Sequence, residues 1–122
     1  MVDKRQAALT NLESLMGSID DLVEALQVYR AECDNTHVLL TGGGSVSEAF
    51  HHAQGTNVRA VATEAVTTFE RNRHRARLSL IDLGVEDGVT KAEFAANLGV
   101  SRQLADRWYR EARTLGDSES VS

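Results

Sequence analysis

Proline is absent from the 122 residues of this chain. Proline breaks the interior of an α-helix because it lacks an amide proton and clashes with the preceding turn. Average usage would give about six prolines in a chain of this length, so their absence permits long, uninterrupted helices. Because apolar residues also recur with helical spacing along much of the chain, we predict an all-α fold.

A heptad repeat begins close to the N-terminus. Asp3 and Gln6 have the spacing of a capping box at the start of a helix. Two apolar series with a seven-residue period follow: Leu12, Ile19, Leu26 and Cys33, and Ala8, Leu15, Leu22 and Tyr29. This a/d stripe predicts a long amphipathic, coiled-coil-like helix over roughly residues 4–33.

Such a helix leaves an apolar seam in water unless a second helix covers it. The covering helix can come from another copy of the chain or, in a hairpin, from later in the same chain, and both apply if two chains build one bundle. No other segment has a matching stripe of this length. We therefore predict a dimerisation helix over residues 1–34. Its expected contacts are Leu12, Leu15, Ile19, Leu22, Leu26 and Tyr29.

Residues 34–44 interrupt the helical pattern and end in three consecutive glycines. Glycine is costly in a helix because it loses the most backbone entropy on folding. A phosphate-binding loop would end in Gly-Lys-Ser/Thr after a strand, a pattern that is missing here. Ser45 and Glu48 instead have capping-box spacing, which predicts a short helix that Gly55 closes. Residues 35–56 are thus interpreted as a glycine-rich hinge and a short helix.

Charge is distributed unevenly along the chain, whose net charge is −5. Residues 1–56 carry eight acidic and three basic side chains, whereas residues 57–113 carry eight acidic and ten basic ones. Residues 114–122 add two acids and are expected to form a disordered tail. Because the acidic excess lies in the first half and most arginines lie in the second, the two halves are expected to have different electrostatic roles.

The stretch from Thr90 to Arg110 carries the most specific motif. Thr90 and Glu93 have capping-box spacing, and Ala95 is a small residue where two helices can touch. Gly99, four residues later, tolerates the positive φ of a tight turn, and Ser101 stands at the N-cap of a second helix. Residues 90–112 resemble the DNA-binding helix-turn-helix superfamily. The resemblance implies a C-terminal tri-helical domain within residues 57–113, with buried positions at Phe94, Leu98, Val100, Ala105 and Trp108.

The resemblance also implies a function. In this superfamily the second helix enters the major groove, where arginine pairs with guanine and glutamine with adenine. The expected DNA contacts are Lys91, Ser101, Arg102, Gln103, Asp106, Arg107 and Arg110. Sequence-specific binding of double-stranded DNA by a homodimeric transcriptional regulator is therefore the leading hypothesis. The alternative is a protein-interaction or assembly accessory factor of the plasmid or phage type, which uses the acidic N-terminal helix.

Four further arginines, Arg71, Arg73, Arg75 and Arg77, precede the motif. Residues two apart on a helix lie about 200° apart around its axis. Arg71 and Arg75 therefore share one face and Arg73 and Arg77 another, so all four cannot contact one DNA duplex. We expect two of them to contact phosphates and two to be structural or idle; the alternative is a solvated helix face paired with acids such as Glu70 and Asp82.

Other kinds of site have little support in the sequence. Cys33, His37, His51 and His52 lack the paired ligand spacings of structural zinc sites, so no metal or cofactor is expected. No motif of nucleophilic or acid–base catalysis stands out, and we expect no enzyme. The chain lacks a signal-peptide pattern and an apolar run long enough to span a membrane. A cytoplasmic protein is the expectation, with any small-molecule effector left open.

Overall fold

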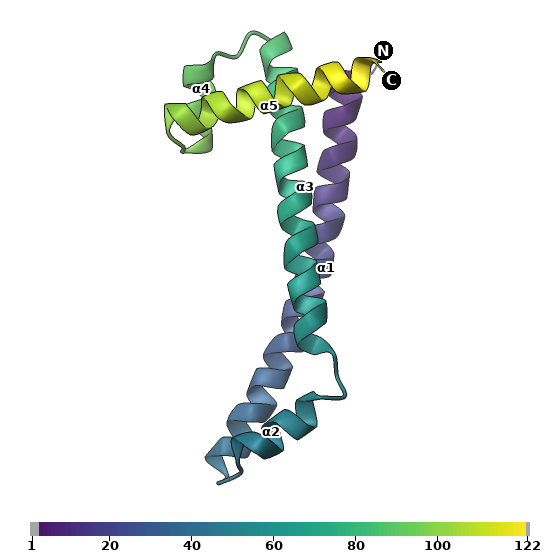
Figure 1. Cartoon of the computed structure of the whole chain (residues 1–122), viewed down its shortest axis with the longest axis vertical. Helices are drawn as coiled ribbons and strands as arrows, with labels where there is room; N and C mark the ends of the chain where they lie inside the picture. The colour runs from purple at the N-terminus through teal and green to yellow at the C-terminus, as the bar shows by residue number, and fades with distance from the viewer. Residues whose placement is uncertain (1–2, 122) are drawn as a thin grey trace. The chain divides into compact units, whose positions relative to one another are not determined.

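The computed structural model describes residues 3–121, and the side chains of residues 3–115. The described residues form five helices and no strands: α1 (Lys4–Thr41), α2 (Val46–Ala53), α3 (Val58–Glu86), α4 (Lys91–Leu98) and α5 (Arg102–Val121) (Figure 1). The predicted all-α class is confirmed. None of the described helices combines the length and the apolar character that crossing a bilayer requires.

Side-chain caps begin three of these helices at the residues that the sequence marks. A carboxylate oxygen of Asp3 accepts hydrogen bonds from the amides of Arg5 and Gln6 at 3.0 and 3.4 Å. The Ser45 hydroxyl accepts the amide of Glu48 at 3.1 Å, and the Thr90 hydroxyl accepts the amide of Glu93 at 3.2 Å. Each cap satisfies an amide that has no partner within the first turn.

The first helix is longer than its heptad repeat predicts. It continues through residues 34–41, which we expected to lie in the hinge, and the break is confined to residues 42–45. Gly43 has a φ of 89°, and the amides of Gly43 and Gly44 donate to the carbonyls of Leu40 and Leu39. This pairing is the Schellman motif, which satisfies the last carbonyls of a helix. The glycines therefore end α1 without weakening the turns before them.

At the other end of the chain, α5 extends to Val121. It thus includes most of residues 114–122, where the sequence suggests a disordered tail. The Thr114 hydroxyl donates to the Arg110 carbonyl at 3.0 Å, as a residue within a helix can. Ser122 lies outside the described residues.

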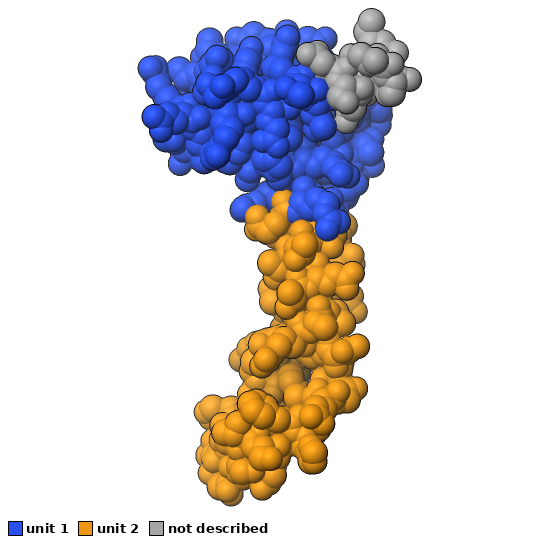
Figure 2. Space-filling view, viewed as in Figure 1, with its two compact units in different colours: residues 1–15, 71–122 blue, residues 16–70 orange. Residues whose placement is uncertain are grey.

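The chain divides into two compact units, residues 1–15 with 71–122 (unit 1) and residues 16–70 (unit 2) (Figure 2). These units cut across the segments that we expected, because α1 and α3 each contribute residues to both. Unit 1 has its core where Leu78 and Ile81 of α3 meet Ala112 of α5. Val85, Phe94, Trp108 and Tyr109 pack around these buried side chains.

Polar contacts join α1 to α3 within unit 1. The Lys4 ammonium lies 3.3 Å from a carboxylate oxygen of Asp82. The side-chain amide of Asn11 donates to the Ser79 hydroxyl, and that of Asn72 donates to the Ser14 carbonyl at 3.4 Å. Asp82 is therefore paired with the first helix, rather than with the arginines of α3 as the sequence suggested.

In unit 2, the stretch of α1 around residues 18–25 lies beside the stretch of α3 around residues 61–68, and small side chains are buried there. Ser18 and Ala25 of α1 and Ala62 of α3 are buried. Ser18 and Ala25 also line one side of a groove whose other side is Val61, Glu64, Ala65 and Thr68. Small residues let two helix backbones approach closely, so a serine and alanines take the most buried positions of this contact, while Leu22 and Tyr29 on the same side of α1 are half-buried.

Two helical glycines, Gly17 of α1 and Gly84 of α3, provide a matched test of the packing of Phe94 against α3. A Cβ built on Gly17 meets nothing within 4 Å, whereas one on Gly84 comes within 2.8 Å of the Phe94 ring. Gly17→Ala is expected to stabilise the fold by about 0.5–1 kcal/mol through reduced backbone entropy. Gly84→Ala should destabilise it by about 1–3 kcal/mol because the packed ring must move. Urea unfolding followed by circular dichroism measures both changes, and an equal effect of the two substitutions would contradict this packing.

Candidate nucleic-acid interface

Helices α4 and α5 are joined by a three-residue turn, residues 99–101. Gly99 occupies the left-handed region at φ 67°, and the Val100 amide donates to the Ala95 carbonyl at 3.1 Å. The Ser101 hydroxyl then caps α5 by accepting the Leu104 amide at 3.2 Å. Ala95 and Ala105 are buried, as expected for small residues at a close contact between two helices. The local sequence signals of the motif thus each have a structural counterpart.

One side of α5 is committed to the core of unit 1. Ala105 and Ala112 are buried, while Trp108 and Tyr109 are half-buried against the Leu78–Ile81 cluster. These residues recur at spacings of three and four, which places them on one side of the helix. This side fixes the orientation of α5 about its own axis, and with it the direction in which every other side chain points.

The opposite side of α5 is polar and exposed. At 100° per residue, its members fall within a sector of about 140°. The exposed members are Arg102, Gln103, Arg107, Arg110 and Arg113. Arg113 was missed by sequence reasoning because it lies beyond the resemblance to the superfamily, although its spacing of three from Arg110 could have revealed it. Four guanidinium groups therefore share one open surface.

Asp106 lies within this surface and neutralises part of it. Its carboxylate oxygens are 2.9 Å from the Lys91 ammonium of α4 and 3.1 Å from the Arg110 guanidinium of α5. The Lys91 ammonium also lies 4.7 Å from the centre of the Tyr109 ring. The hydrogen bond from Lys91, assisted by the positive charge of Arg110, holds the pKa of the Asp106 carboxyl below its ordinary value of 3.8. Asp106 is thus a fixed anion at neutral pH, held between two cations.

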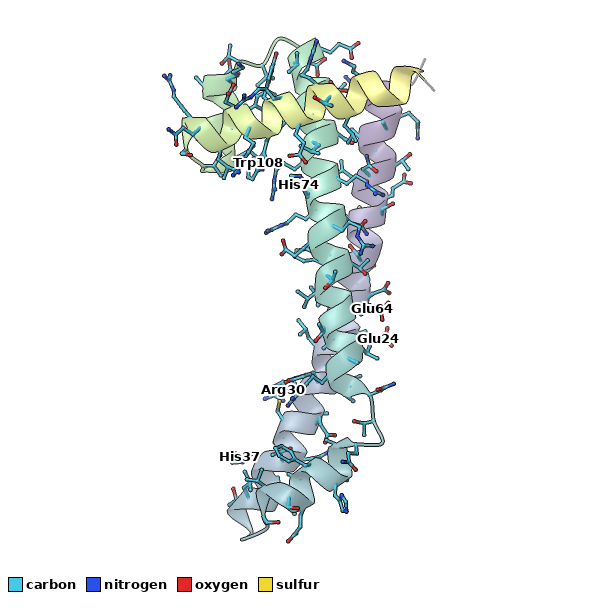
Figure 3. All side chains as sticks on the ribbon, in the orientation of Figure 1. Glu24, Arg30, His37, Glu64, His74 and Trp108 are labelled. Atoms are coloured by element: carbon cyan, nitrogen blue, oxygen red, sulfur yellow. The ribbon has the colours of Figure 1, made fainter. Side chains whose placement is uncertain are left out.

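A second polar cluster joins α3 to α5 in unit 1 (Figure 3). The Arg77 guanidinium stacks over the Trp108 ring at 4.0 Å, and His74 meets the same ring edge-on at 6.4 Å. His74 also contacts Arg77 through Nδ1 at 3.1 Å and Glu111 through Nε2 at 2.9 Å. Trp108 therefore packs against the core, as its position in the motif predicts, and Arg77 is held by the protein itself. Arg71 and Arg75 are exposed.

Leu98 differs from its expected position, because it is exposed rather than buried. It lines a shallow groove with Leu12, Leu80, Phe94 and other residues of unit 1. The groove holds about 230 Å³, below the roughly 300–1,000 Å³ of typical small-molecule sites. It offers room for a side chain of another molecule more readily than for an effector.

Of the six residues expected at a dimer contact, Leu12 and Leu15 lie half-buried in unit 1, and the other four fall into two sets within unit 2. Leu22 and Tyr29 are half-buried on the side of α1 that carries Ser18 and Ala25, whereas Ile19 and Leu26 remain exposed. Among the described residues, no three His, Cys, Asp or Glu side chains come together to hold a metal ion. Cys33 is an exposed free thiol.

Comparison of the chain with protein-family models, curated proteins and solved structures finds no match.

The position of Asp106 between two cations predicts its titration. The carboxyl carbon of Asp106, followed by NMR, should titrate with a midpoint below 3.8. Lys91→Met should raise this midpoint more than Arg110→Met does, because the hydrogen bond from Lys91 is the larger cause. Since the folded-state pKa is lowered, the contribution of the pair to stability is present above the ordinary pKa and disappears as pH falls through the lowered one. Equal midpoints in all three proteins would contradict this arrangement.

Proposed function

We propose that this chain is a sequence-specific DNA-binding regulator that acts as a homodimer, with α4 and α5 as a helix-turn-helix and α5 as its recognition helix. One observation carries the proposal: α5 buries one side in the core of unit 1 and exposes Arg102, Gln103 and Arg107 on the other. Arginine and glutamine are the side chains that most often pair with guanine and adenine edges. A rigid helix that presents them is what reading of the major groove requires.

The ion pairs of Asp106 with Lys91 and Arg110 distinguish two groups of exposed side chains, one for base contacts and one for phosphate contacts. Arg102, Gln103 and Arg107 lie in the first two turns of α5, nearest the end that enters the groove in this superfamily. Lys91 and Arg110 share the Asp106 carboxylate. We therefore assign base reading to the first three residues and phosphate contacts to Lys91 and Arg110. Asp106 then orients these two cations.

The alternative function, a protein-interaction or assembly accessory factor, is supported by a different observation. Residues 16–34 of α1 include five acidic side chains and one basic one, and several large apolar side chains there are exposed. Such a surface fits a protein partner and repels DNA. It is also compatible with the first proposal, since a dimeric regulator needs a contact between its subunits outside the recognition helix.

Selection from a random pool of duplexes at two salt concentrations tests the proposed function directly. A dimeric regulator is expected to recover an inverted repeat whose half-sites lie about 34 Å apart. Its affinity should fall steeply as salt rises, because lysines and arginines displace counterions from the phosphates. An absence of duplex binding at low salt would exclude the proposed function and favour the accessory factor.

Single substitutions then separate base reading from general attraction. Arg102→Ala is expected to reduce discrimination between the selected site and a mismatched site by about 1–3 kcal/mol, since a bidentate base contact is lost. Lys91→Ala should weaken binding to both duplexes alike and reduce the salt dependence. Arg59→Ala, which removes an exposed arginine of unit 2, is the control and should change neither. Electrophoretic mobility shifts measure all three variants, and identical behaviour of the Arg102 and Lys91 variants would refute the assigned roles.

A further inference from the structure

Helix α1 has two apolar sides within unit 2, and α3 covers only one of them. The covered side carries Ser18, Leu22, Ala25 and Tyr29. Beside it run four large side chains that remain uncovered, which we name the open stripe: Met16, Ile19, Val23 and Leu26, with exposed fractions of 62%, 39%, 49% and 48%. Single exposed apolar residues are common on proteins, but a contiguous row of them marks an interaction surface.

The open stripe lies away from the groove between α1 and α3. That groove is lined by Ser18, Asp21 and Ala25 on α1 and includes Glu64 of α3. At 100° per residue, these α1 residues lie to one side of Leu22 and the open stripe lies to the other. The groove therefore carries two carboxylates, whereas no charged residue interrupts the open stripe between Met16 and Leu26. Of the two flanks of α1, only the stripe suits an apolar partner.

The spacing of the open stripe identifies a helix as what covers it. Its members are three, four and three residues apart, the alternation by which one helix packs lengthwise against another. A second copy of α1 carries the same spacing, so the stripe complements itself about a two-fold axis. With Met16 opposite Leu26 and Ile19 opposite Val23, every large side chain of the stripe meets another.

Arg30 determines the direction in which two such helices pack. It continues the stripe, four residues after Leu26, and is exposed. A parallel pair would place the two Arg30 guanidinium groups side by side, which like charges oppose. An antiparallel pair centred near Asp21 separates them by roughly 27 Å at 1.5 Å per residue. It also brings Arg30 opposite Leu12 of the partner subunit, one residue before Glu13, so a carboxylate lies at the flank of the contact beside the Arg30 charge.

We propose that α1 of a second copy of this chain packs antiparallel on the open stripe, through Met16, Ile19, Val23 and Leu26. This contact deepens the dimeric part of the proposed function. The heptad predicts a contact through the a positions Ile19 and Leu26 together with the d positions Leu22 and Tyr29. In the proposed contact Ile19 and Leu26 are joined instead by the neighbouring Met16 and Val23, because α3 of the same chain covers Leu22 and Tyr29. The interface is independent of α5, so it can be tested without DNA, and a failure to bind DNA leaves its test unaffected.

Two valines of α1 provide the decisive comparison. Val23 lies in the open stripe and Val28 outside it, and their exposed fractions are 49% and 50%. Light scattering during gel filtration should give about 27 kDa for the full chain, twice its mass of 13.3 kDa. Val23→Glu should reduce this value to that of a monomer, whereas Val28→Glu should leave it unchanged. A monomeric parent chain, or equal behaviour of the two variants, would overturn the proposal.

The orientation has its own test, which needs no substitution. Cys33 is an exposed free thiol and the only cysteine of the chain, so a spin label attaches there alone. An antiparallel pair centred near Asp21 places the two labelled positions roughly 36 Å apart along the helix axis. Double electron–electron resonance on the labelled protein should give a distance near this value. A distance below about 20 Å, as a parallel pair requires, would overturn the antiparallel arrangement even if Val23→Glu failed to fold.

Discussion

Burial of one side of α5 against α3 is the interaction on which the candidate interface depends. Ile81 is almost completely buried and, with Leu78, receives Ala112 from α5, while Trp108 and Tyr109 pack around them. A helix with one side fixed in this way presents its other side to solvent without rotation, so the polar residues of α5 act as a rigid set. The electrostatics follow from the same contact. Tyr109 brings its ring close to the Lys91 ammonium, and the preceding turn brings Asp106 between Lys91 and Arg110.

The sequence predicted the starts of the helices better than their ends. Side chains of Asp3, Ser45 and Thr90 satisfy amides two or three residues away, and such local chemistry is visible in a short window of sequence. The end of α1 could not be placed in this way. Residues 34–41 follow Cys33, the last member of the heptad series, yet the glycines after them form a Schellman motif, and the helix continues to Thr41. The three glycines therefore predict a long hinge from residue 35 onward, whereas in the structure they form, with Ser45, a four-residue connection between α1 and α2.

Within the candidate interface, the sequence identified residue types but not their partners. Spacing places Arg102 and Arg107 on the exposed side of a helix, as the structure has them. The pairing of Asp106 with Lys91 joins residues on different helices and depends on the angle at which α4 meets α5, which no single helix encodes. The same limitation explains why only some heptad residues of α1 face α3 in unit 2. A heptad pattern predicts contacts from large apolar residues, whereas the most buried residues between these helices are Ser18, Ala25 and Ala62, whose small size matters more than their hydrophobicity.

The hydrogen bonds of His74 run in one direction across the junction of α3 and α5. An arginine side chain can only donate hydrogen bonds, so the Nδ1 atom that faces Arg77 accepts one, and Nε2 faces the Glu111 carboxylate as the donor. The chain of donors thus passes from α3 to α5. Arg77 also lays its positive charge flat over the Trp108 indole. At this junction a positive charge serves to hold two helices together.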